Sequence, residues 1–114
     1  MLPEDDVQRV REWIESRNDQ VPTDIRDKIR YEMDAGHHAI TVFECRPPWK
    51  PEFGPEWTRM EVALLRFTTI TDQWSLYWRD SDQVFHEYDL VDPTPDVGQL
   101  LAEIDRDPTC IFWG

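Results

Sequence analysis

Arginine and tryptophan side chains give this chain its most distinctive chemistry. Ten of its twelve cationic residues are arginines, and several stand beside aromatic residues. Arg46 precedes Pro47-Pro48-Trp49, and Arg79 follows Tyr77-Trp78. A planar guanidinium can form paired hydrogen bonds with a carboxylate or a phosphate, and it can stack on an aromatic ring. The pattern therefore indicates either internal ion pairs or a pocket for an anionic or planar ligand.

The candidate ligand-binding residues combine these arginines with neighbours that can bind an anion or a ring. They are Glu44, Arg46, Trp49, Arg66, Arg79 and His86. The 47–57 loop, which is rich in proline and aromatic residues, should be ordered and folded back over the sheet above them. In the competing, structural interpretation, Arg46 or Arg66 pairs with Glu44 or Glu61, and tryptophans stack on the guanidinium planes.

Arg66 separates these two interpretations. It belongs to an expected strand at 59–68, in which Met60, Val62 and Leu64 share its side of the pleat. Three apolar residues on that side favour the inward face, which predicts a partly buried Arg66. A buried guanidinium stays charged and needs a carboxylate, an aromatic face or a ligand.

No motif for catalysis or metal binding reaches useful specificity. His37 and His38 are adjacent in an expected turn, and no zinc-motif spacing brings Cys45 to His86. Neither a Gly-x-Ser-x-Gly elbow nor a glycine-rich phosphate loop is present. Asp34 with Glu44-Cys45-Arg46 partly matches the site of metal-dependent nucleases, but arginine cannot transfer a proton at neutral pH. We expect no metal and no cofactor, and leave open whether there is any catalysis.

Composition limits the class of protein. The chain has 114 residues, 39% of them hydrophobic, and six tryptophans, which predicts one folded domain over residues 1–114. Its formal charge of −12 disfavours duplex nucleic acid and anionic membranes as partners. The absence of a signal peptide and of a long apolar run predicts a cytoplasmic location. Cys45 and Cys110 should be reduced and packed in the core, not bridged.

Hydrophobic periodicity predicts the order of the elements. Pro3 should occupy the first position of a helix that ends near residue 20. Period-two alternation predicts strands at the following ranges: 29–34, 39–46, 59–68, 74–79 and 84–88. Thr94 should cap a second helix that begins at Pro95, and the apolar tail after Pro108 should dock on the body.

Short turns between the expected strands favour antiparallel pairing of each strand with the next. The fold predicted from the sequence is therefore α+β: a five-strand antiparallel meander with an N-terminal and a C-terminal helix packed on the sheet. Trp74, Leu76 and Trp78 should share one face of a strand, next to Val62 and Leu64.

Several motifs, taken in order, resemble a bacterial family catalogued as domain of unknown function 3024. The set consists of Glu44-Cys45-Arg46-Pro47-Pro48-Trp49, Trp57-Thr58-Arg59, Trp74-Ser75-Leu76-Tyr77-Trp78-Arg79-Asp80, Phe85-His86-Glu87-Tyr88, Glu103-Ile104-Asp105-Arg106-Asp107-Pro108 and Phe112-Trp113-Gly114. The resemblance runs from about Ile29 to the C-terminus and weakens over the first helix. It implies a small stand-alone bacterial protein and assigns no activity, ligand or catalytic residue.

Two functions from different classes follow. The leading hypothesis is a cytosolic binding or adaptor domain without catalysis. The alternative is a small ligand-binding protein or enzyme with an Arg/aromatic pocket for an anionic or planar ligand under the 47–57 loop. The expected partner is thus an unknown protein or a small anionic ligand, and the oligomeric state is not predicted. Stacked aromatics and arginines would also suit single-stranded nucleic acid, which the negative charge disfavours.

Overall fold

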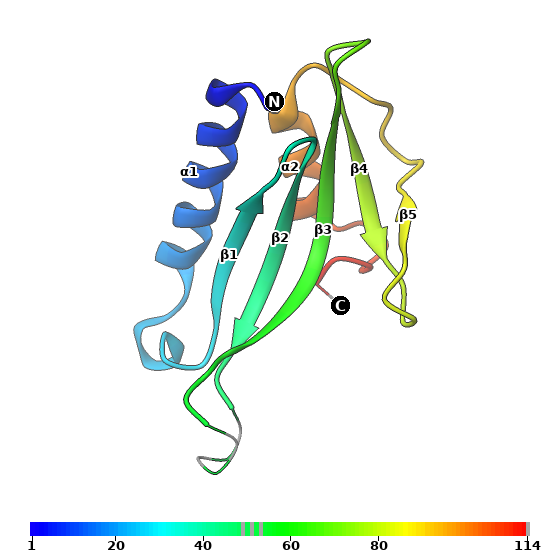
Figure 1. Cartoon of the computed structure of the whole chain (residues 1–114). Coiled ribbons are helices and arrows are strands. Elements are labelled where there is room, and N and C mark those ends of the chain that lie inside the picture. Colours follow the sequence, from blue (N-terminus) through cyan, green and yellow to red (C-terminus); the bar gives the residue numbers. More distant parts are fainter. Residues whose placement is uncertain (49, 51, 53, 114) are drawn as a thin grey trace.

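In the computed structural model, which describes residues 1–48, 50, 52 and 54–113, five strands pair antiparallel in chain order (Figure 1). They are β1 (Arg30–Ala35), β2 (Ala39–Arg46), β3 (Thr58–Thr68), β4 (Gln73–Arg79) and β5 (Phe85–Glu87). Helix α1 (Glu4–Gln20) precedes the sheet, and α2 (Val97–Arg106) follows it. A short 3-10 helix, η1 (Thr23–Ile25), was not predicted. The predicted α+β meander is confirmed.

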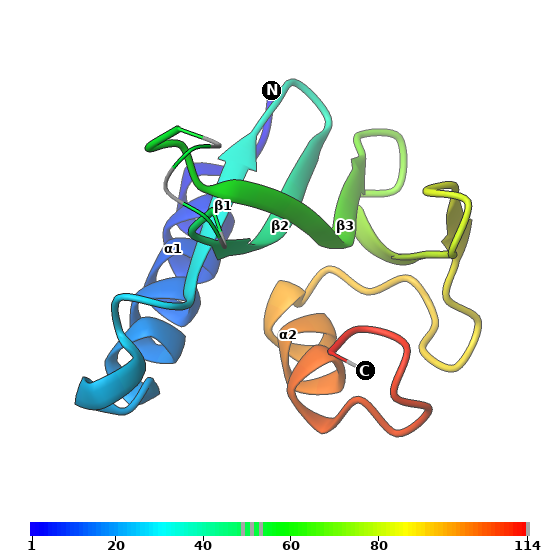
Figure 2. The same cartoon turned by 90° about the horizontal axis from the view of Figure 1, so that it is seen from below.

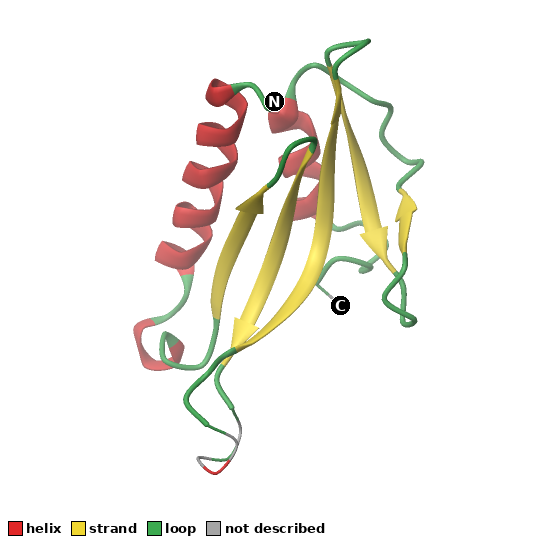
Figure 3. Ribbon diagram, in the orientation of Figure 1, coloured by secondary structure: helices red, strands yellow, loops and turns green. Residues whose placement is uncertain are grey.

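Both helices lie on the same face of the sheet. Seen along the strands, α1 lies under β1, and α2 lies with the C-terminal segment under the other half of the sheet (Figure 2). Colouring by secondary structure shows α2 behind the strands and α1 beside β1 (Figure 3). Within the described chain, no helix is long and apolar enough to cross a membrane.

The hydrophobic core fills the space between the helices and that face of the sheet. Its fully buried side chains come from both helices and the three central strands. They include Val10, Ile40, Val42, Leu65, Trp74, Leu76, Leu100 and Ile104. Trp74 reaches from β4 to α1, where its Nε1 donates to Asp6 Oδ2 at 2.9 Å. Burying a large side chain contributes about 1.5–3 kcal/mol, so this layer fixes the sheet against the helices.

A β-bulge in β3 decides which side chains face the core. Val42 lies opposite Ala63, whereas Phe43 lies opposite Glu61, so Val62 is an extra residue. A bulge interrupts the alternation, and both Val62 and Ala63 are buried in the core.

Beyond the bulge, the strand alternates with Leu65 and Phe67 toward the helices, and Arg66 faces the opposite side and is exposed. The prediction that Arg66 faces inward is wrong. Trp74, Leu76 and Trp78 do pair along one face, but with Phe67, Leu65 and Ala63 instead of Val62 and Leu64. Counting apolar residues favoured the wrong side because the extra residue at the bulge places Leu64 and Arg66 on the face opposite the buried Val62.

The caps of both helices differ from the predicted ones. Pro3 precedes α1 as its N-cap and is not its first residue. The Asp96 side chain caps α2 by accepting from Gly98 N at 3.0 Å. Thr94 instead exchanges two backbone hydrogen bonds with Trp74, which extends the sheet by one bridge. That pairing holds Thr94 in the extended conformation, so the helix begins later.

The C-terminal segment docks on α2, as predicted. The Asp107 carboxylate accepts from the backbone N–H groups of Phe112 and Trp113 at 3.1 and 3.0 Å. The Trp113 indole donates to Ile104 O at 2.9 Å. Phe112 is buried against Tyr88, with ring centroids 5.2 Å apart. These contacts close the helical layer beside β4 and β5.

Candidate functional site

The sheet face opposite the helices is the surface on which the predicted Arg/aromatic chemistry gathers. We call it the open face. Cross-strand partners project on the same side of a sheet, so the register defines its members. They are Arg30, Glu32, Asp34, Ala39, Thr41, Phe43, Cys45, Arg59, Glu61, Leu64, Arg66, Thr68, Gln73, Ser75, Tyr77, Arg79, Phe85 and Glu87.

Arg59 organises one end of the open face. Its guanidinium donates to both carboxylate oxygens of Asp34 at 3.1 Å and lies 3.2 Å from a Glu32 oxygen. It also lies over the Phe43 ring, 3.9 Å from the centroid. The hydrogen bonds to Asp34 raise the pKa of Arg59 above its usual value. The Arg59 side chain is therefore fixed by partners on β1 and β2, and its guanidinium is not available to bind a ligand.

Arg30 attaches the end of the 47–57 loop to the same cluster. Its Nε donates to Glu32 at 2.8 Å, and its guanidinium lies 4.3 Å from the Trp57 ring centroid. This stacking agrees with the structural interpretation of the Arg/aromatic pattern, but the sequence did not identify Arg30 and Trp57 as the partners. It orders the chain just before β3.

The two cysteines have different environments, and neither forms a disulfide. Cys45 is fully buried, and its cross-strand partner on β3 is Arg59. Burial raises the pKa of the Cys45 thiol, so little reactive thiolate forms at neutral pH. Cys110 is exposed, contrary to the expectation that both thiols belong to the core.

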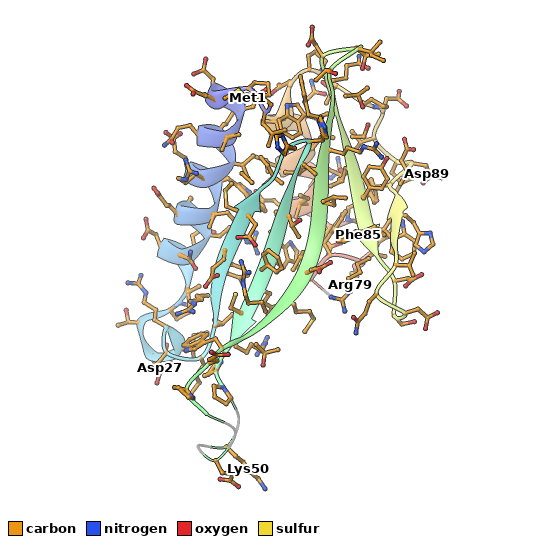
Figure 4. The ribbon with its side chains drawn as sticks, in the orientation of Figure 1. Met1, Asp27, Lys50, Arg79, Phe85 and Asp89 are labelled. Carbon is orange, nitrogen blue, oxygen red and sulfur yellow. The ribbon has the colours of Figure 1, made fainter. Side chains whose placement is uncertain are left out.

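The centre of the open face is apolar and carries two arginines without a carboxylate partner. Leu64 and Tyr77 are cross-strand partners, and both are partly exposed. Arg66, two residues from Leu64, makes neither a hydrogen bond nor an ion pair with any described residue. Arg79, two residues from Tyr77, donates to the Glu61 carbonyl at 3.4 Å and to no other described residue. In Figure 4 Arg79 lies near Phe85, its partner on β5.

His86 belongs to a structural cluster at the β4–β5 turn. Its Nε2 lies 2.5 Å from Asp80 Oδ2, and its ring lies 4.9 Å from that of Trp78. The other Asp80 oxygen accepts from the backbone N–H groups of Asp82 and Val84. The hydrogen bonds from His86 and then Val84 lower the pKa of Asp80. The cluster ties the short edge strand to β4.

The described candidate residues fall into three separate places. Glu44 and Arg46 pair with each other at 2.7 Å at one end of β2, as the structural interpretation predicts. Arg66 lies opposite Ala39 at the other end of β2, and Arg79 and His86 lie near the β4–β5 turn. The geometry does not gather them around one cavity, and their part in ligand binding stays a prediction.

The 47–57 loop does not cover these residues where it is described. Lys50 lies well beyond the end of the sheet (Figure 4), contrary to the expected fold-back. Trp49, the remaining candidate residue, lies outside the described residues. The loop returns to the sheet at Trp57, through the contact with Arg30.

Sequence reasoning missed a second Arg/aromatic cluster, on the helical side. The Arg17 guanidinium lies 3.9 Å from the Trp113 ring centroid and 4.9 Å from that of Tyr31. It pairs with Asp105 at 2.6 Å, and the Trp13 indole donates to the same carboxylate at 3.0 Å. The available signal was the i, i+4 spacing of Trp13 and Arg17 on α1.

A cavity of about 250 Å³ adjoins this second cluster. It opens between the end of α1 and β1, and apolar residues such as Val21, Pro22, Ile25 and Ile29 line it together with Arg17. The charge of Arg17 is already balanced by Asp105, so the cluster mainly holds the C-terminal segment against α1 and β1. Among residues 1–48, 50, 52 and 54–113, no group of three His, Cys, Asp or Glu side chains could hold a metal ion.

Comparison with known proteins identifies one family. The chain matches the family model described as Domain of unknown function (DUF3024) over residues 2–114. The match includes the first helix, where the resemblance seen in the motifs weakened. No curated protein and no solved structure matches the chain.

Proposed function

This chain belongs to the Domain of unknown function (DUF3024) family, whose description names no activity, and we propose that it is a non-catalytic binding or adaptor module that docks a partner on its open face. One observation carries the proposal: both helices pack on one side of the sheet, so within the described chain no helix covers the other side (Figure 2). The partly exposed side chains of Leu64, Tyr77 and Phe85 lie there.

The state of the reactive side chains supports binding over catalysis. Cys45 is buried and its thiol pKa is raised, which disfavours a nucleophile. His86 already uses one ring nitrogen on Asp80. Arg30, Arg46 and Arg59 pair with carboxylates of this chain. A rigid, prearranged surface lowers the entropic cost of docking a partner.

The alternative function, a pocket for an anionic or planar ligand under the 47–57 loop, has less support. Such a pocket needs its arginines together under the loop, but Arg46 is held by Glu44, and the described part of the loop does not lie over Arg66 or Arg79. We further propose that the module acts in the cytoplasm of a bacterium, in keeping with its acidic composition.

Co-purification from the native cell extract tests the proposal. The bait would be the tagged chain in three forms: the parent, Leu64→Asp on the open face, and Gln8→Asp on the exposed surface of α1. Both substitutions add one negative charge. The parent and Gln8→Asp should retain the same protein partner, and Leu64→Asp should lose it.

Retention of the partner by both variants would contradict the proposal, because the binding surface would then lie elsewhere. A small molecule that co-purifies with the parent in stoichiometric amount, without a protein, would favour the pocket alternative. Circular dichroism and a thermal melt of each variant establish that Leu64→Asp is folded.

A further inference from the structure

From the centre of the open face, we infer that the partner contributes an acidic segment whose carboxylates pair with Arg66 and Arg79 on either side of an apolar residue that packs on Leu64 and Tyr77. This inference rests on the proposed function and names the chemistry of the partner. It follows from charge complementarity with Arg66 and Arg79, neither of which forms an ion pair with a described carboxylate.

The two arginines are exceptional for this face. Arg59 and Arg30 lie on the same surface, and each pairs with a carboxylate of β1 at 3.2 Å or less. The chain has 24 acidic residues against 12 basic ones, so acidic neighbours are abundant. Nevertheless Arg66 has no partner among the described residues, and Arg79 has only a carbonyl oxygen.

Their spacing suits a short protein segment. Arg66 lies opposite Ser75 on β4, and Arg79 lies four residues further along that strand. At about 3.3 Å per residue, the two positions are about 13 Å apart along the strand. Leu64 and Tyr77 form the cross-strand pair between them. Two carboxylates four residues apart on an extended segment span the same length. The residue midway between them projects on the same side and can be the apolar one.

The surroundings favour a protein segment over nucleic acid. Glu61 and Glu87 also lie on the open face, as cross-strand partners of Phe43 and Tyr77. A strand of RNA carries a phosphate at every nucleotide and would bring some of them close to these carboxylates. A peptide can place its charges only at the arginines.

Site-specific photo-crosslinking in native cells tests the inference on the full chain. The probe is p-benzoylphenylalanine in place of Tyr77, an aromatic-for-aromatic change, with the same probe in place of Gln8 on α1 as control. Mass spectrometry then identifies the crosslinked peptide. The expected product at position 77 is a partner segment with two or more acidic residues close to the crosslinked position.

Charge reversal supplies the second readout. Arg66→Glu should lower the crosslinking yield at position 77 about tenfold, which corresponds to the loss of one good ion pair. Arg11→Glu is the matched control, since Arg11 lies on α1, donates to Gln8 alone among the described residues and gives the same change in net charge. Its yield should equal that of the parent. Arg66→Gln, with a smaller expected loss, serves if Arg66→Glu fails to fold.

The outcomes separate this inference from the proposed function. The inference of an acidic segment would be overturned by a crosslink to a neutral or basic partner segment, to a second copy of this chain or to RNA. Equal yields for Arg66→Glu and Arg11→Glu would also overturn it. A neutral partner segment at position 77 would still agree with an open-face binding module. Yields at position 77 no higher than at position 8 would overturn the open face as the binding surface.

Discussion

Replacing Tyr88 by phenylalanine should destabilise the fold by about 2 kcal/mol. The Tyr88 hydroxyl donates to Glu103 Oε2 at 2.9 Å, and the two residues are 3% and 7% exposed. Arg106 Nε lies 3.6 Å from the other Glu103 oxygen, beyond hydrogen-bonding distance, and does not replace that donor. A hydrogen bond to a charged group contributes about 1.5–3 kcal/mol. Unfolding by urea, followed by tryptophan fluorescence, measures the change.

The dependence of stability on pH gives a second test of the buried Tyr88–Glu103 pair. Burial, and then the hydrogen bond and charge of Glu103, raise the pKa of Tyr88 from 10.0 to about 12. Because the folded pKa exceeds the unfolded one, this stabilisation is complete below about pH 10 and is lost as pH rises through about 12. A shift of that size corresponds to about 2–3 kcal/mol. Tyr88→Phe should lack this alkaline loss.

Tyr77→Phe is the matched control for Tyr88→Phe. The Tyr77 hydroxyl lies on the open face and makes no hydrogen bond with any described residue. Its removal should change the free energy of unfolding by less than about 0.5 kcal/mol. Should Tyr88→Phe unfold within about 0.5 kcal/mol of the parent, with the same dependence on alkaline pH, the reasoning about the buried pair would be refuted.

Further predictions concern the remaining clusters. Arg66→Ala should leave the urea midpoint nearly unchanged, within about 0.5 kcal/mol, because Arg66 is exposed; a loss of about 3 kcal/mol or more would instead indicate a buried ion pair. Trp113→Ala should cost about 2–4 kcal/mol by releasing the C-terminal segment from Arg17 and Ile104, and an unchanged midpoint would contradict the docking. Because hydrogen bonds lower the pKa of Asp80 below 3.8, its stabilisation should be present above that pH and be lost as pH falls through the folded value; Asp80→Asn should remove this acid dependence, which unfolding at several pH values measures. Finally, an anisotropy titration should detect no binding of duplex DNA at about 150 mM salt, and micromolar affinity would contradict the electrostatic argument.

The strand pattern was predictable because local periodicity determines it. The alternation in Trp74-Ser75-Leu76-Tyr77-Trp78 and the short turns predicted both the meander and the shared face of the two tryptophans. The orientation of β3 was not predictable in the same way. Its apolar residues occur on both sides of the pleat, and the extra residue at Val62 breaks the alternation. Only pairing with Val42 determines which side faces the helices.

The sequence predicted the types of contact at the candidate site but not most of the residues that form them. Arginines do stack on aromatic rings and pair with nearby carboxylates, as the composition suggested. Only Arg46 with Glu44 was identified correctly, since they are two residues apart on one strand. The Arg59–Asp34 and Arg17–Trp113 contacts join residues distant in sequence. Such contacts depend on the register of the sheet and on the docked C-terminus, which no local pattern contains.

Mapping the bound surface by solution NMR tests the central claim most directly. The ¹⁵N-labelled chain would be titrated with the partner that co-purifies with it. Docking on the open face predicts the largest shifts of backbone amides at positions such as Thr41, Leu64, Arg66 and Tyr77, with the outer surface of α1 unchanged. Shifts concentrated on α1 and α2, with β3 and β4 unchanged, would contradict the claim that this acidic α+β chain binds through the uncovered side of its sheet.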